Sequence, residues 1–205
     1  MSIVKLNNQG VKNATAFGSI TGLGSMVFIK KLTASSSATL SFVDGASSVV
    51  LDNTYKEYVF TFNNIHPSTQ AGFSFNGSID SGSNYNVTKT STIFKAYHNE
   101  VGSNDSALYY DTEKDLAQST AFQEVQDAVT ADSDNGLCGT LHLFNPSSTT
   151  FVKHFMVNVQ SMIGTYSQEA FTAGYFNTTS AIDGMQFKYS SGNIDAGDIC
   201  LYGIA

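Results

Sequence analysis

Four histidines are the first residues that could do chemistry: His66, His98, His142 and His154. The last two lie in consecutive stretches of alternating polar and apolar residues, 137–144 and 151–160. If the apolar residues of both stretches share one face, odd positions pair with odd positions, and the most compact register places His142 opposite His154. Two facing imidazoles could start a metal site, but Cys138 is the only further ligand type on that face. The pattern therefore favours a stacked histidine pair on a polar sheet face, and we predict no metal site.

The other motif candidates lack residues that their chemistry requires. No Gly-X-Ser-X-Gly turn presents a serine nucleophile. Residues 132–136 (DSDNG) begin like a calcium loop, but Gly136 replaces the third oxygen ligand and Leu143 stands where the closing glutamate should be. Three acidic residues close together in the chain, Asp111, Glu113 and Asp115, are predicted to lie in a solvated loop. The sequence therefore predicts a protein that is not an enzyme, with no catalytic residues and no cofactor.

Two adjacent tyrosines, Tyr109 and Tyr110, are the best candidates for contact with a partner. They lie in an acidic, turn-rich part of the chain. A tyrosine combines an apolar ring with a polar hydroxyl, which suits contact with a sugar or a protein surface. Adjacent tyrosines also anchor loops, so the pair is a candidate for partner or glycan contact and nothing more specific.

The charges exclude nucleic acid as a partner. All ten basic residues are lysines, and the formal net charge is -7. Without arginine no bidentate contact to phosphate or guanine can form, and an acidic chain repels a polyanion. No apolar stretch approaches the length of a membrane span, and the first residues do not resemble a signal peptide, which predicts a cytosolic protein without membrane contact. Cys138 and Cys200 are accordingly predicted to be buried, reduced thiols and not a disulfide.

The elements that carry these residues are predicted to be strands. Period-2 alternation of polar and apolar residues is typical of a half-buried strand. It occurs in ten stretches: 26–32, 38–43, 55–62, 73–79, 90–98, 137–144, 151–160, 170–176, 185–189 and 199–204. Turns rich in Asp, Asn and Gly join them, which favours antiparallel pairing. We predict an all-β, two-sheet antiparallel sandwich, jelly-roll-like, in preference to a closed barrel.

One central stretch departs from this alternation. Residues 120–129 place Phe122, Val125 and Val129 on one helical face, and Thr120 with Gln123 forms a capping-box pattern. A single short helix is therefore predicted there. We expect one domain over 1–205, with an irregular excursion around 100–136.

Most of the chain resembles a family of virion structural proteins of marine tailed bacteriophages. The similar segments are 57–67 (EYVFTFNNIHP), 82–88 (GSNYNVT), 142–155 (HLFNPSSTTFVKHF), 173–183 (AGYFNTTSAID), 185–197 (MQFKYSSGNIDAG) and 201–204 (LYGI). The resemblance implies a non-enzymatic component of the virion, present in the host cytoplasm during assembly. Its expected partners are other virion proteins, in the capsid or in the tail.

Composition is compatible with that expectation. A weakly charged sandwich rich in Ser, Thr and Asn offers flat faces and edge strands for symmetric association, so we expect a homo-oligomer, as in an exterior capsid decoration or a tail-associated component. The alternative is a lectin-like receptor-binding module of a tail fibre or spike, with host-surface glycan held by Tyr109 and Tyr110. An enzyme such as a depolymerase is the third hypothesis.

Overall fold

The computed structural model describes residues 26–102 and 105–205, and these residues form twelve strands and no helix. In chain order the strands are β1 (Met26–Thr33), β2 (Leu40–Val43), β3 (Glu57–Pro67), β4 (Ala71–Ser78), β5 (Lys89–Asn99), β6 (Ser106–Tyr110), β7 (Gln123–Val129), β8 (Leu137–Phe144), β9 (Lys153–Ile163), β10 (Tyr166–Phe176), β11 (Gly184–Tyr189) and β12 (Ile194–Ile204). No helix in the described part of the chain could cross a membrane. The prediction of one domain over 1–205 includes residues outside these ranges and stays a prediction.

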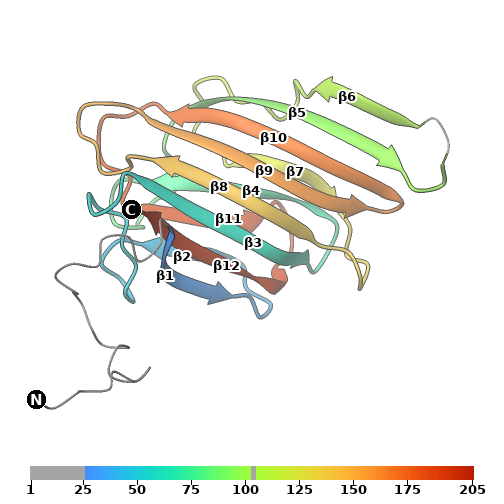
Figure 1. The fold of residues 1–205 in the computed structure, drawn as a ribbon, viewed down its shortest axis with the longest axis horizontal. Helices are drawn as coiled ribbons and strands as arrows, with labels where there is room; N and C mark the ends of the chain where they lie inside the picture. The colour runs from blue at the N-terminus through green and yellow to red at the C-terminus, as the bar shows by residue number, and fades with distance from the viewer. Residues whose placement is uncertain (1–25, 103–104) are drawn as a thin grey trace, which may run out of the picture.

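The strands form two antiparallel sheets packed face to face, which confirms the predicted all-β sandwich (Figure 1). The large sheet has the order β1-β12-β3-β8-β9-β10-β5-β6, and the small sheet has the order β2-β11-β4-β7. Each of the ten predicted strands is present. The two strands that the sequence did not predict, β6 and β7, both come from the central stretch, and each lies at the edge of a sheet.

An aromatic half of the interior lies between β3 of the large sheet and β2, β11 and β4 of the small one. Six fully buried or nearly fully buried rings make up this aromatic half: Phe42, Phe60, Phe62, Phe73, Phe75 and Phe187. The ring centroid of Phe187 is 5.2 Å from that of Phe60 and 5.4 Å from that of Phe62. Inward-facing positions alternate along each strand, so these rings interlock as the core of the sandwich.

A polar half of the interior lies where β7 packs on β9 and β10, with β5 beside them. It consists of Lys89, Ser91, Lys95, Gln123, Gln126, Ser161, Gln168 and Thr172, all buried. The Gln126 amide donates to Ser161 Oγ at 2.7 Å and to Gln168 Oε1 at 2.6 Å. Hydrogen bonds of this kind offset the cost of removing amides and hydroxyls from water.

The predicted helix at 120–129 is wrong, because this stretch contains β7. Its pairing with β4 shifts register twice, between Ala71 and Phe73 and between Phe73 and Ser74, and β7 has an extra residue at each shift. A bulge reverses which face the following residues occupy. The two bulges therefore spread the buried positions of β7 over a spacing that resembles a helical one.

Candidate binding groove on the large sheet

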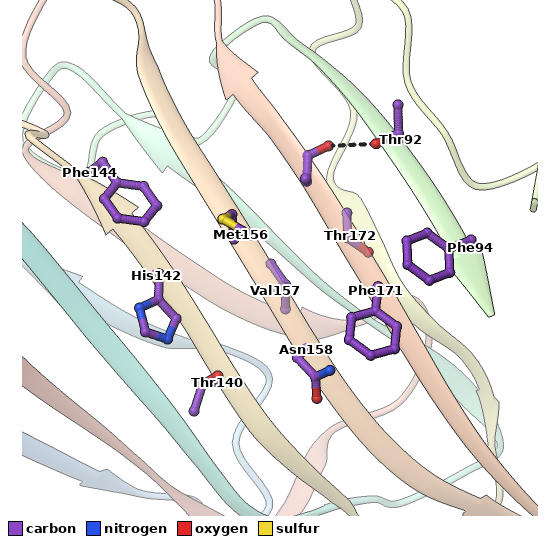
Figure 2. A pocket seen from close by; sticks show the side chains of 11 residues that line it. Thr92, Phe94, Thr140, His142, Phe144, Met156, Val157, Asn158, Phe171 and Thr172 are labelled. Atoms are coloured by element: carbon purple, nitrogen blue, oxygen red, sulfur yellow. Dashed lines mark hydrogen bonds between the residues drawn. The ribbon is translucent and has the colours of Figure 1, made fainter. Parts of the chain in front are cut away.

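A groove of about 400 Å³ crosses the outer face of β8, β9, β10 and β5 (Figure 2). Alternation along each strand decides which side chains reach it, because the odd positions of β8 and β9 fill the core. The outward residues that shape the groove are mostly apolar: Phe94, Phe144, Met156, Phe171 and Ala173, with Thr92, Thr140, His142 and Asn158 as the polar ones.

Two stacked phenylalanines form one wall of the groove. Phe171 of β10 and Phe94 of β5 are direct cross-strand partners, with ring centroids 5.0 Å apart and planes inclined by 12°. Phe94 is 43% exposed, and Met156 on the neighbouring strand β9 is 56% exposed. Apolar side chains of this size normally avoid water, so their presence on one outer face makes this face a candidate contact surface.

A row of outward-facing residues continues beyond the groove across the large sheet, and it is exposed on both sides of Val59, which is itself only 3% exposed. The pairing registers align one residue from each strand in a row: Phe28, Tyr202, Val59, His142, Met156 and Ala173, from β1 to β10. Phe28 is 56% exposed and packs edge-on against Tyr202, with centroids 5.6 Å apart. We call this row, together with Phe94 and Phe171, the outer band.

The polar groups within the outer band and beside it are paired with one another. His142 Nδ1 lies 2.6 Å from Glu57 Oε1 on β3, and the His142 ring stacks on Phe144 at 6.3 Å. Asn158 Nδ2 donates to Glu169 Oε1 at 3.0 Å. These pairings hold the polar atoms at fixed positions beside the apolar rings. The groove is therefore suited to binding an apolar or planar group, and no nucleophile beside a base is among its lining residues.

The predicted pairing of His142 with His154 is wrong. His142 lies opposite Met156, and Leu143 lies opposite Phe155, so the register differs from the predicted one by two residues. Odd positions do pair with odd positions, but the connection between the strands is longer than predicted. Phe151, the first apolar residue of the predicted strand 151–160, lies in this connection and is 68% exposed. The His154 ring lies instead beside that of Tyr175 of β10, with centroids 6.2 Å apart and planes inclined by 58°.

The two cysteines are free, and only one of them is buried. Cys200 is buried as predicted, whereas Cys138 is exposed, because its even position in β8 faces outward. The Cys138 thiol donates to Asn64 Oδ1 at 3.4 Å, and the His66 ring bonds the Asp132 carbonyl at 3.1 Å. The thiol and the imidazole thus have separate partners and do not form a nucleophile and base pair.

The segment that begins like a calcium loop is folded around its own side chains. The Asn135 amide donates to Thr130 Oγ1 and, at 3.4 Å, to Asp132 Oδ2. Within residues 26–102 and 105–205, no three His, Cys, Asp or Glu side chains gather as they would around a metal ion.

Tyr109 and Tyr110 lie on β6, the last strand of the large sheet, and point to opposite faces because they are adjacent in a strand. Tyr110 pairs with Phe94 and so extends the outer face, and its hydroxyl donates to Asp115 Oδ2 at 2.7 Å. That hydrogen bond raises the pKa of Tyr110. The Tyr109 ring packs edge-on against Tyr97, with centroids 6.1 Å apart. Their role in binding stays a prediction.

A buried ion cluster was not anticipated from the sequence. Lys95 Nζ lies 2.7 Å from Asp111 Oδ2 and 2.6 Å from Asp127 Oδ1, and Lys95 is fully buried. Burial alone would lower the pKa of Lys95, but the two carboxylates outweigh it and raise this pKa. Burial would raise the pKa of Asp111, but Lys95 and the Glu113 N–H outweigh it and lower this pKa. Asp111 is thus buried and paired, not solvated as predicted.

The position of the lysines in the alternation pattern could have revealed this cluster. Lys95 has the same parity in its strand as Ile93, which is fully buried. A lysine on the buried face of a strand requires a partner, because an unpaired buried charge is costly.

Comparison of the chain with protein-family models, with curated proteins and with solved structures finds no match. The virion role that the sequence resemblance implies therefore stays a prediction. The functional argument depends on the geometry of the site.

Proposed function

We propose that the protein is a non-enzymatic structural component of a tailed bacteriophage virion that assembles as a symmetric homo-oligomer. The outer band is the observation that carries this proposal. It crosses seven neighbouring strands of one sheet and exposes Phe28, Met156 and Phe94. Large exposed apolar surfaces are typical of protein interfaces, and a twofold contact needs a face that matches itself.

Association through the face of the sheet is favoured over association through its β1 edge. β1 is an edge strand of the large sheet and carries Lys30 and Lys31. Lysines on an edge strand disfavour the addition of another strand. Two copies that place their outer bands together would pack sheet against sheet, at the spacing of about 10 Å found in sandwiches.

In the virion such an oligomer would serve as an exterior capsid decoration or a tail-associated component. Its remaining partners would be other virion proteins. Before assembly it would be present in the host cytoplasm.

The proposal is tested by introducing a charged residue at the middle of the outer band. Met156→Lys brings like charges together in a twofold contact, and light scattering after gel filtration should show the mass of the wild-type oligomer fall to that of a single chain. Phe151→Lys is the matched control, because Phe151 is also exposed but lies outside the outer band, and it should leave the oligomer intact. A wild-type chain that is monomeric at micromolar concentration would contradict the proposal.

A lectin-like receptor-binding module of a tail fibre or spike is the second candidate. The observation that favours it is a cross-strand row in which Tyr110, Phe94 and Phe171 are followed by Asn158. Aromatic rings beside an amide can stack on a sugar and hydrogen-bond its hydroxyls. Replacing Tyr109 and Tyr110 with Ala should then abolish adsorption to the host while the particles stay intact. On the structural proposal, the same change leaves adsorption unaltered.

A further inference from the structure

The ion cluster around Lys95 is an unusual feature of the polar half. One ammonium group faces two carboxylates, at 2.7 Å and 2.6 Å, so the three charges do not cancel. The side chain of Lys95 has no exposed surface, and that of Asp111 is 10% exposed. The three residues come from different places in the fold: Lys95 from β5, Asp111 from the position directly after β6 and Asp127 from β7 of the other sheet. A simple ion pair would need only one of the two aspartates.

The two carboxylates have different environments. Asp111 Oδ1 accepts a hydrogen bond from the Glu113 N–H at 3.0 Å, and the Asp111 N–H donates to the Ile93 carbonyl at 3.0 Å. Asp111 is therefore fixed with one oxygen on a backbone donor and the other towards the amine. The Asp127 side chain is 33% exposed, and its hydrogen bond in the described structure is to Lys95. Asp127 can thus exchange protons with the amine on one side and with water on the other.

We propose that Lys95 and Asp111 condense to an intramolecular amide bond, with Asp127 as the proton carrier. Asp127 takes one proton from the Lys95 ammonium and passes it to Asp111 Oδ2. The neutral amine then attacks Asp111 Cγ, and the N–H of Glu113 stabilises the negative charge that develops on Oδ1. A second proton leaves the nitrogen through Asp127 and joins the departing oxygen. One C–N bond forms, one C–O bond breaks, one water leaves, and Asp127 returns to its carboxylate form.

The surroundings favour this condensation over the ion pair. The Lys95 amine is held 2.7 Å from Oδ2 of the Asp111 carboxyl group that it attacks, which replaces the cost of bringing an amine and an acid together in solution. The amide removes two charges from a buried site, where charges are costly, and leaves the negative charge on the partly exposed Asp127. The water is released beside Asp127 and does not stay in the core. The bond closes β5 and β6 into a covalent loop and secures β6, whose five residues are all exposed, to the sheet.

Trypsin digestion of the unfolded wild-type protein, followed by mass spectrometry, tests this proposal. Trypsin cleaves after lysine, and an amide on Lys95 blocks cleavage there. We expect one peptide that runs from Thr90 to Lys114, uncut at Lys95 and lighter than its sequence by one water. Complete cleavage at Lys95, with both product peptides at their sequence masses, would overturn the proposal. So would a loss of water in a chain still cleaved at Lys95, because that result indicates a succinimide.

Variants assign the roles of the two aspartates. Asp111→Ala should give tryptic peptides at their sequence masses, without the loss of one water, and should allow cleavage at Lys95. Asp127→Asn should leave a larger fraction of the chain without the amide bond. Lys31→Met is the matched control, because it removes an exposed lysine that pairs with Asp198 at 3.3 Å, and it should leave the cross-linked peptide unchanged. An Asp111→Ala chain that still lacks cleavage at Lys95 would contradict the assignment. The proposal does not depend on the oligomeric state or on the proposed virion role.

Discussion

The aromatic half and the polar half of the interior are stabilised by different forces, although the same two sheets enclose both. In the aromatic half, Phe187 touches several other rings, and the stability comes from apolar surface removed from water. In the polar half, the same kind of inward position is occupied by Lys89, Lys95 and Gln126, whose burial is unfavourable unless every polar atom has a partner. A buried position can therefore be a source of stability in one region and a cost in the other.

The polar half is not fully satisfied. Within the described residues, the Oε1 atom of Gln126 and the Oγ1 atom of Thr172 are buried without a hydrogen-bond partner. Lys89 Nζ donates to the Ala121 carbonyl at 2.5 Å and lies 5.8 Å from the centre of the Phe176 ring, and no carboxylate of the described residues pairs with it. The comparison thus predicts that removing a buried ring from the aromatic half lowers the free energy of unfolding, whereas removing an unsatisfied polar group from the polar half raises it.

The largest effect is expected in the aromatic half. Phe187→Ala removes a fully buried ring between the two sheets, and its neighbours cannot all move to fill the space. We expect the free energy of unfolding to fall by about 3–5 kcal/mol, as measured by urea denaturation. Phe151→Ala is the control, because its ring is exposed, and it should change stability by no more than about 0.5 kcal/mol. Similar losses for both variants would show that the six rings are not the main source of stability.

In the polar half, Lys89→Met is expected to stabilise the fold. Burial lowers the pKa of Lys89 to about 7 from 10.5. Between these pH values folded Lys89 binds fewer protons than unfolded Lys89, so its contribution makes the free energy of unfolding rise with pH. At pH 7 the methionine should raise the free energy of unfolding by about 1–4 kcal/mol, the range found when buried ion pairs are replaced by apolar side chains.

The pH dependence provides the control for this prediction. The advantage of Lys89→Met over the wild type should shrink as pH rises from 7 towards 10.5, and urea denaturation at several pH values measures it. Lys31→Met replaces a half-exposed lysine, so its free energy of unfolding should change with pH as that of the wild type does. A stabilisation that does not vary with pH would mean that the charge on Lys89 is not its cause.

The sequence was sufficient to predict the strands that follow simple alternation. β5 and β8 were predicted close to their observed bounds, because one face of each is buried and the other is not. β6 was missed because all five of its residues are exposed, so it has no alternation to detect. β7 was missed because two bulges disturb its period. Bulges depend on the partner strand, which a single sequence does not reveal.

The site was predicted less well, for a related reason. Alternation shows which residues share a face, and the parity of β8 and β9 was correct, but it does not determine how far the turn extends. Asn145 donates to the Lys56 carbonyl, and Ile182 donates to the Pro146 carbonyl, so distant parts of the chain hold this turn and thereby influence the register. The outer band depends on the registers of seven strands, and the pairings β1–β12, β12–β3, β3–β8 and β10–β5 bring together residues far apart in sequence.

The smallest expected effect tests whether an unpartnered group in the polar half is a cost. Thr172→Val keeps the shape of the side chain but removes a hydroxyl that has no hydrogen-bond partner. An unsatisfied buried polar group costs about 1–3 kcal/mol, so we expect the free energy of unfolding to rise by about 1 kcal/mol in urea denaturation. Thr92→Val is the matched control, because Thr92 is exposed on the outer face and bonds the Ala173 carbonyl at 3.4 Å. It should change stability by no more than about 0.5 kcal/mol. A loss of stability for Thr172→Val would instead indicate that an internal water bridges Thr172 to the unpartnered Gln126 Oε1, and the polar half would then be a hydrated network with its partners complete.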